Sequence, residues 1–341
     1  MSDVAILEDV NRLPRGGKAW VYRWCDYVEM RCLIHPDRRF SRDNLVEGFG
    51  EAADIDTTEY LDIGNDEGDE VFQPLSTDDT NAATTDRHEA FSARCFRQLH
   101  WRSKAFGADW PFVIDPADGE VKVRSGDRTA RHWLYLQLLL CASLSYCPSK
   151  RRANLTGPFE ALSLHVFRHL MPVGSEVHEF GTGRAKRYTG HLYDRLVALA
   201  RDLRGVFKLQ REHFARNDVG DGGLDLVAWH GLGDHRDGII AALAQCGCTA
   251  DGWPLKMQSA SPDRLSGQLS VGTSWATYYF MPLDLADEIN GNMDWQQKSD
   301  MATAIVIDRL RFLRLADADA LLTQGILQPA LVREAEALQI T

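Results

Sequence analysis

The stretch GDGGLDLVAWHGLGDHRDGIIAALAQCGCTADGWPLK, residues 220–256, decides the fold of this chain. Two apolar runs within it predict neighbouring strands joined by a turn rich in glycine and aspartate. Outward from this stretch, we predict strands at 177–180, 224–229, 238–246 and 275–281, a short helix starting near Asp251, and helices at 156–171, 189–204 and 305–316. Helices that alternate with strands in this way indicate an α/β fold with a central mixed β-sheet flanked by helices.

Asp225 is unusual because it lies inside an apolar run. A carboxylate among apolar neighbours costs free energy unless something pairs with it. In an antiparallel pair, Trp229 would lie opposite either Ile239 or Ala241. Asp225 would then face residue 243 in the first case and Gln245 in the second, on the same side of the sheet. A carboxylate, an amide oxygen and a strand carbonyl together would suit Mg²⁺ or Mn²⁺.

These residues resemble the restriction-endonuclease-like PD-(D/E)xK nuclease superfamily, and its Mrr-like branch most closely, in which Gln often replaces the second acid. The similarity lies in GDGGLDLVAW, AQCGCTADGW and PLK, and it extends over residues 155–315. The resemblance implies that Asp225 is the central metal ligand, Gln245 the second metal-site residue and Lys256 the catalytic lysine. Glu160, in GPFEALS, matches the helix glutamate that often completes the metal site and the catalytic set.

Position 247 departs from the pattern of this superfamily. The usual spacing is an acid or Gln, then one residue, then Lys, and here the lysine position is Gly247. A lysine displaced to position 256, eleven residues after Gln245, is the interpretation that we favour. An inactive site is the alternative.

The resemblance implies a Mg²⁺- or Mn²⁺-dependent endonuclease that hydrolyses phosphodiester bonds of DNA in a bacterial restriction or anti-phage defence system. The metal would lower the pKa of a bound water, and Lys256 would stabilise the developing negative charge. Arg184, Lys186 and Arg187, in GTGRAKRYTG, are candidates for binding the nucleic-acid backbone, although a solvent-facing basic loop is an equal alternative. Two other functions remain open: an RNase of the same fold, and a catalytically silent interaction subunit.

The domain prediction has three parts. Residues 1–150 form a mainly helical N-terminal domain with a hairpin near 112–123, residues 151–320 the nuclease domain, and residues 321–341 a C-terminal helical tail. Residues 51–89 hold 13 acidic residues and one basic residue, which favours an exposed acidic loop. The other residues hold 37 basic and 36 acidic side chains, so a local basic surface for DNA remains compatible with the net charge of −11.

Composition excludes several classes of protein. With 44% hydrophobic and 26% charged residues, the 341-residue chain has a globular composition. Its most apolar stretch, 133–146, is too short to span a bilayer and predicts a buried helix. Seven scattered cysteines and a start without a secretion signal favour reduced thiols in a cytoplasmic protein. DNA is the expected partner, with a partner ATPase, a sensor protein or a second copy of the chain as further candidates.

Two sets of residues raise the alternative of zinc. The spacing of His230, His235, Cys246 and Cys248 differs from that of the usual zinc knuckle, so we favour the Mg²⁺ site instead. The pair formed by His165 and His169 is predicted to be an exposed or half-buried pair on one helix.

Overall fold

The computed structural model describes residues 4–14, 21–51, 81–115, 119–181, 187–218, 220–296, 298–301 and 303–340. The chain forms two compact units. The first consists of residues 1–155, 283–296 and 327–341, and the second of residues 156–282 and 297–326. The sequence placed a boundary at 150 and treated 321–341 as a separate tail, whereas residues 327–341 belong to the first unit. That unit also includes 283–296, which the sequence assigned to the nuclease domain.

The first unit is built mainly from helices, as expected. They are α1 (Val21–Ile34), α2 (Arg42–Glu51), α4 (Asn81–Phe106), α5 (Ala130–Ala142) and α12 (Pro329–Glu336). A three-stranded antiparallel sheet has the order β1 (Arg39–Ser41), β3 (Glu120–Val123), β2 (Phe112–Asp115), which confirms the hairpin predicted near 112–123. A second hairpin joins β10 (Ala286–Ile289) to β11 (Asn292–Trp295).

Helix α4 corrects the predicted acidic loop, because residues 81–89 are the beginning of this helix. Its apolar residues recur at helical spacing, and Phe91, Cys95 and Leu99 are buried. In the first turns of the helix, the His88 ring stacks on the Phe49 ring of α2 at a centroid distance of 4.8 Å. The rest of the predicted loop, residues 52–80, lies outside the described residues.

A charged cluster lies inside the first unit. The Arg102 guanidinium contacts carboxylate oxygens of Asp26 at 2.8 Å, Asp284 at 2.9 Å and Glu29 at 3.1 Å. The Tyr135 hydroxyl donates to Glu29 at 2.8 Å. All these side chains are buried, so the one guanidinium compensates several carboxylates that burial would otherwise penalise.

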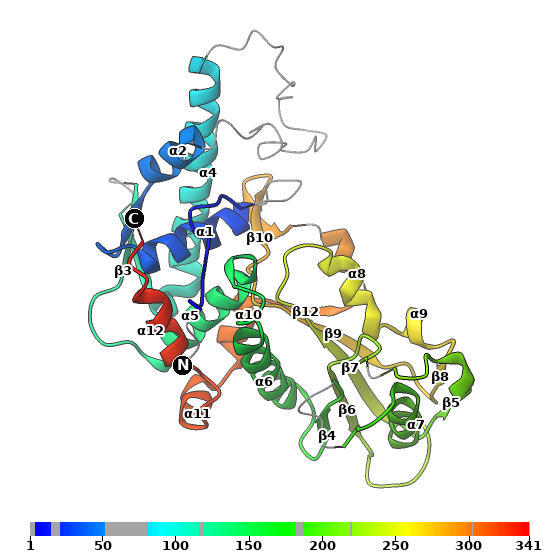
Figure 1. Cartoon of the computed structure of the whole chain (residues 1–341). Coiled ribbons are helices and arrows are strands. Elements are labelled where there is room, and N and C mark those ends of the chain that lie inside the picture. The colour runs from blue at the N-terminus through cyan, green and yellow to red at the C-terminus, as the bar shows by residue number, and fades with distance from the viewer. Residues whose placement is uncertain are drawn as a thin grey trace. The chain divides into compact units, whose positions relative to one another are not determined.

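The second unit is centred on a five-stranded sheet in the order β12–β9–β7–β6–β4. Strand β6 pairs antiparallel with β4 and β7, whereas β9 pairs parallel with β7 and β12, so the sheet is mixed as predicted (Figure 1). These strands are β4 (Glu176–Glu179), β6 (Leu226–His230), β7 (Ile240–Cys246), β9 (Ala276–Phe280) and β12 (Ile305–Ile307). The other elements are α6 (Ala153–Leu170), α7 (Leu192–Asp202), β5 (Val206–Phe207), α8 (Trp253–Met257), α9 (Pro262–Leu265), β8 (Leu269–Ser270), α10 (Arg309–Leu315) and α11 (Ala318–Thr323).

Helices α6 and α7 cover opposite faces of this sheet. The Phe167 ring of α6 contacts the rings of Tyr278 and Phe280, at centroid distances of 5.4 and 5.8 Å. The leucine stripe of α7 packs in the cluster that contains Val227 and Leu243. Successive strand residues point to opposite faces, so even-numbered residues of β9 face α6 while Val227 and Leu243 face α7. The sheet is therefore buried between two helical layers.

The prediction of a single helix over 305–316 was wrong for its first residues. Three β-branched residues, 305–307, form β12 beside β9. The Asp308 side chain then accepts a hydrogen bond from the Arg311 N–H at 3.0 Å and begins α10.

The most apolar stretch of the chain is buried, as its composition predicted. Helix α5, from the most apolar stretch of the chain, is almost entirely buried, as expected. Within the described residues, no helix has both the length and the apolarity that crossing a membrane requires. All seven cysteines are free thiols.

Candidate functional site

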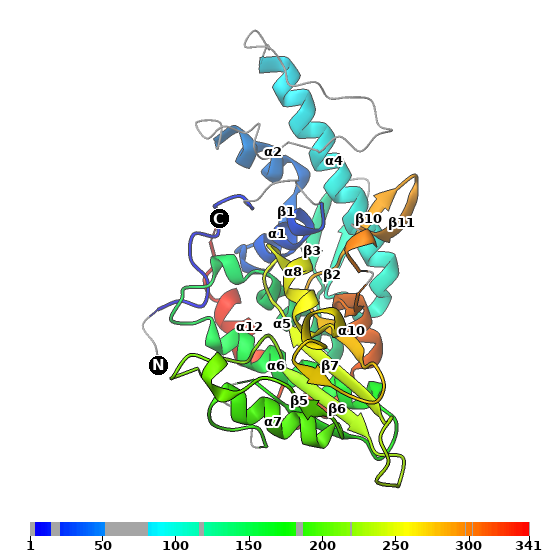
Figure 2. The ribbon, with the colours of Figure 1, turned by 90° about the vertical axis from the view of Figure 1, so that its right-hand side faces the viewer.

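The register of β6 and β7 decides between the two pairings that the sequence allowed. Trp229 lies opposite Ala241, and Leu226 lies opposite Ala244. The paired residues end at Leu226 and Ala244, and Asp225 and Gln245 are their direct chain neighbours at this end of the two strands. The Asp225 N–H donates to the Ala244 carbonyl at 3.0 Å, so the two chains remain hydrogen-bonded at this point. Figure 2 shows β6 and β7 side by side.

The glycines before Asp225 form a tight turn that leads directly into the sheet. Gly222 and Gly223 have φ angles of 65° and 81°, which favour glycine. A Cβ on Gly223 would lie 2.5 Å from the Ser259 Cβ, so space also requires glycine there. The Asp221 carboxylate closes the turn by accepting from the Gly223 N–H at 2.8 Å.

The environment of the Asp225 carboxyl disfavours its charge. Burial, helped by the negative charges of Asp221 and Glu160, raises its pKa to about 7. The hydrogen bond that Asp225 Oδ2 accepts from the Cys246 N–H, 2.7 Å long, acts in the opposite direction. Both neighbouring charges are negative, so a cation bound here would relieve the repulsion.

Gln245 offers a second oxygen beside this carboxyl. Its Oε1 is shielded from solvent, and in the part of the chain that the structure describes it has no hydrogen-bond partner. A buried acceptor without a partner costs about 1–3 kcal/mol. This oxygen is therefore available to a bound group.

Glu160 lies on α6, near the same end of β7. Its charge acts on both Asp225 and the Cys246 thiol, and the Ser163 side chain, one turn further along α6, hydrogen-bonds to that thiol. Glu160 is thus close enough to Asp225 for its charge to act there, and the joint role of Glu160, Asp225 and Gln245 as metal ligands stays a prediction.

Lys256 is exposed on the short helix α8. Its Nζ donates to Thr249 Oγ1 at 2.7 Å. Trp253 and Met257 are the buried residues of this helix, which leaves Lys256 on its solvent side. The role of this lysine at the metal stays a prediction.

Gly247, in the position where the resemblance expects a lysine, contacts Tyr279. A Cβ on Gly247 would lie 2.0 Å from the Tyr279 hydroxyl oxygen, closer than any real contact. The Gly247 N–H donates to the Phe280 carbonyl at 2.9 Å, which fixes its backbone against β9. With Tyr279 in this place, no side chain fits at 247.

Two of the three residues proposed to bind a nucleic-acid backbone, Arg184 and Lys186, lie outside the described residues. Arg187 donates to both carboxylate oxygens of Asp202, at 2.8 and 2.6 Å, and its guanidinium lies 5.2 Å from the centre of the Trp229 ring. The hydrogen bonds to Asp202 raise the pKa of Arg187. Arg187 therefore ties the end of α7 to β6, and its contact with nucleic acid remains a prediction.

Arg195 is a positioning residue that the sequence analysis missed. It is buried on α7, and its Nη1 donates to the Phe180 carbonyl, just after β4, at 3.0 Å. Its Nη2 donates to the Gly220 carbonyl at the start of the glycine turn. An arginine within the leucine stripe of α7 was the signal that could have identified it.

The residues considered for zinc do not form a cluster. Among the described residues, the structure has no group of three or more His, Cys, Asp or Glu side chains that could hold a metal. His165 and His169 are neighbours on α6, with ring centroids 4.5 Å apart, and His169 Nδ1 lies 2.9 Å from the His165 carbonyl.

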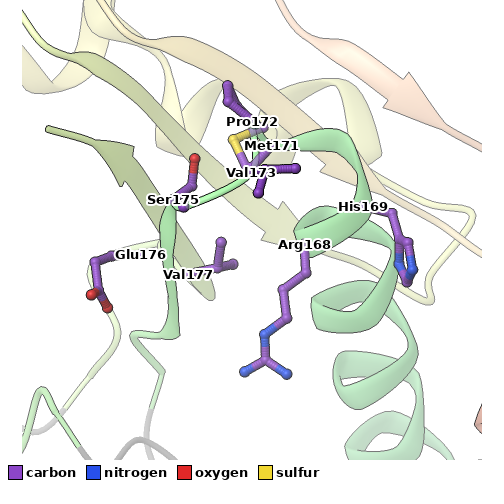
Figure 3. Close-up of a pocket in the computed structure, with 9 residues that line it drawn as sticks. Arg168, His169, Met171, Pro172, Val173, Ser175, Glu176 and Val177 are labelled. Atoms are coloured by element: carbon purple, nitrogen blue, oxygen red, sulfur yellow. The ribbon is translucent and has the colours of Figure 1, made fainter. Parts of the chain in front are cut away.

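A surface pocket lies at the far end of α6 from Glu160. Figure 3 shows Arg168 and His169 on the last turn of the helix and Ser175, Glu176 and Val177 on the chain that follows. None of the predicted site residues lines this pocket. We therefore place the candidate site at the other end of the sheet.

Comparisons with known proteins identified no relative of this chain. No protein-family model matches the chain, and neither the curated proteins nor the solved structures gave a match.

Proposed function

We propose that this chain is a metal-dependent endonuclease that hydrolyses phosphodiester bonds of DNA, and that its second unit is a restriction-endonuclease-like core. The observation that carries the proposal is the position of the Asp225 carboxyl, which accepts a hydrogen bond from the N–H of Cys246, the residue that follows Gln245 at the end of β7. The electrostatic influence of Glu160 on Asp225 adds a third oxygen-bearing side chain to the same end of the sheet.

The residues at this end of the sheet fit a hard divalent cation. Gln245 Oε1 is a buried oxygen that lacks a partner within the described residues, and Asp225 is surrounded by negative rather than positive charge. Oxygen ligands of this kind suit Mg²⁺ or Mn²⁺. Asp225, Gln245 and Glu160 would hold the ion, which when bound supplies a water of lowered pKa.

Other residues of the chain would position Asp225 and the DNA for the reaction. Arg195 holds the glycine turn against the end of β4, which fixes the position of the Asp225 backbone. Lys256 lies on the segment that directly follows β7, and release from Thr249 would let its ammonium reach a phosphate and stabilise negative charge. Arg184, Lys186 and Arg187 would bind the DNA backbone.

The proposed setting is bacterial restriction or anti-phage defence in the cytoplasm. A partner ATPase or sensor protein would supply the activating signal, and a second copy of the chain would supply the second cut of a duplex. The same chemistry on RNA is the alternative within this fold.

One observation favours a second function, a catalytically silent interaction subunit. The Tyr279 ring occupies the space in which a lysine at position 247 would begin, and the ammonium of Lys256 is bound to Thr249. A chain that had lost catalysis would retain the sheet without a working lysine.

A nuclease assay tests these alternatives. Plasmid DNA and single-stranded RNA are incubated with the wild-type chain in Mg²⁺, Mn²⁺ or EDTA, beside the Asp225→Ala variant and the matched control Asp237→Ala on the exposed β6–β7 turn. We expect metal-dependent cleavage of DNA by the wild type and the control only. Cleavage of RNA alone would assign an RNase, and no cleavage together with unchanged Mn²⁺ binding by Asp225→Ala would refute the metal site.

A further inference from the structure

Tyr279 is a fully buried residue at the candidate site. Its side chain has no solvent exposure, and among the described residues its hydroxyl has no hydrogen-bond partner. A phenol that is buried in this way usually finds a partner. The missing partner therefore needs an explanation.

The sheet places this hydroxyl beside the residues already described. Tyr279 on β9 lies opposite Gln245 on β7, and the Asp225 carboxyl accepts a hydrogen bond from the N–H of Cys246, the next residue of β7. Paired residues of neighbouring strands project to the same face, so the Gln245 and Tyr279 side chains lie side by side. The charge of Asp225 acts on the Tyr279 hydroxyl, which places the two groups close together.

The chemistry of Asp225, Gln245 and Tyr279 is complementary. Asp225 and Gln245 supply oxygens, which accept or bind a cation, whereas a phenol supplies an O–H donor. A phenol carries its proton at neutral pH, so the hydroxyl is able to donate. An anionic oxygen bound next to a cation would satisfy the donor and the acceptors at once, as a phosphate of a nucleic acid does.

The Tyr279 hydroxyl fills the space beside Gly247. The first side-chain atom of any residue at 247 would overlap the Tyr279 hydroxyl oxygen, since the two would be 2.0 Å apart. The hydroxyl thus lies where a lysine side chain at this position would begin.

We propose that Tyr279 is a catalytic residue of this site, whose hydroxyl donates a hydrogen bond to a non-bridging oxygen of the scissile phosphate in the place of the lysine missing at 247. This inference rests on the proposed nuclease function. It assigns to the phenol the stabilisation of the charge that develops on the phosphate. One preorganised donor to a developing oxyanion contributes about 100- to 1,000-fold in mutagenesis of other enzymes.

The test compares two tyrosines that are adjacent in sequence. Tyr279→Phe removes only the hydroxyl and keeps the ring against Gly247. Tyr278→Phe removes a hydroxyl from the other face of the sheet, where the ring packs on Phe167. For both variants we would measure kcat and KM for cleavage of a DNA duplex in Mg²⁺, the affinity for Mn²⁺, and the thermal midpoint.

We expect Tyr279→Phe to lower kcat by about 10- to 100-fold, with Mn²⁺ affinity and KM within about 2-fold of the wild type, and Tyr278→Phe to behave as the wild type. A Tyr279→Phe variant that cleaves at the wild-type rate would overturn the inference and leave the nuclease function standing. Loss of Mn²⁺ binding in Tyr279→Phe would also overturn it, because the hydroxyl would then support the metal instead. A wild-type chain that cleaves no nucleic acid in any metal would overturn both proposals.

Discussion

Replacing Asp225 by Asn should remove part of the pH dependence of stability. In the folded chain the pKa of Asp225 is raised to about 7 from an ordinary value of 3.8, so the folded state holds the proton more tightly than the unfolded state. A raised pKa of this kind gives stability that is complete below the unfolded value and is lost as the pH rises through 7. Asn keeps an oxygen that can accept from the Cys246 N–H but cannot ionise.

The magnitude follows from the pKa. Between pH 5 and pH 7 each pH unit changes the free energy of unfolding by about 1.4 kcal/mol, which amounts to about 2.7 kcal/mol over the interval. Relative to the wild type, Asp225→Asn should therefore be about 2.7 kcal/mol more favoured at pH 8 than at pH 5. For a unit of this size, this corresponds to about 5–10 °C in the thermal midpoint.

The assay is thermal unfolding of both chains in EDTA at pH 5, 6, 7 and 8, with Asp237→Asn as a control at an exposed carboxyl. The wild type should lose stability relative to Asp225→Asn as the pH rises, and Mn²⁺ at pH 8 should restore stability to the wild type alone. A difference between the two chains that is the same at pH 5 and pH 8 would refute the reasoning.

Three further predictions concern packing and burial. Gly247→Ala should destabilise the chain by about 1–3 kcal/mol because its Cβ overlaps the Tyr279 hydroxyl, and urea unfolding would test this; an unchanged midpoint would contradict the contact. Arg102→Met should cost about 3–5 kcal/mol because it leaves buried carboxylates without their cation, so a variant as stable as the wild type would show that the cluster is not buried. Six of the seven thiols are buried, so a thiol reagent at pH 8 should modify the native chain far more slowly than the urea-unfolded chain, and equal rates would count against this.

The part of the site that the sequence predicted rests on local pattern. An acid inside an apolar run marked Asp225, and the following apolar run marked the strand that ends near Gln245. The register stayed open because Trp229 opposite either Ile239 or Ala241 gives an apolar pair. The structure has Trp229 opposite Ala241, but the two pairings differ by two residues, so both keep the same side chains on the face that packs against α7 and no local pattern separates them.

Other features depend on contacts between distant segments, or have only a weak signal in the sequence. Nothing in the spacing connects Tyr279 to Gly247, because they meet only when β9 pairs parallel with β7. The β10–β11 hairpin has a weak local signal in Asn290–Gly291, whose positive φ angles of 52° and 75° suit a tight hairpin turn. The helical period of 305–316 concealed β12, although its three β-branched residues and Asp308 marked a strand followed by a helix start.

The division of the chain has a consequence for its synthesis on the ribosome. The chain crosses between the two units four times, at 155/156, 282/283, 296/297 and 326/327. Glu336, in the last helix, pairs with Arg38 at 3.2 Å and also with Arg128. The first unit therefore cannot complete its fold until residues 327–341 have been synthesised. Chains that stop before 327 would leave that unit incomplete, so dissecting this protein requires circular permutation or co-expression of residues 327–341 rather than simple truncation.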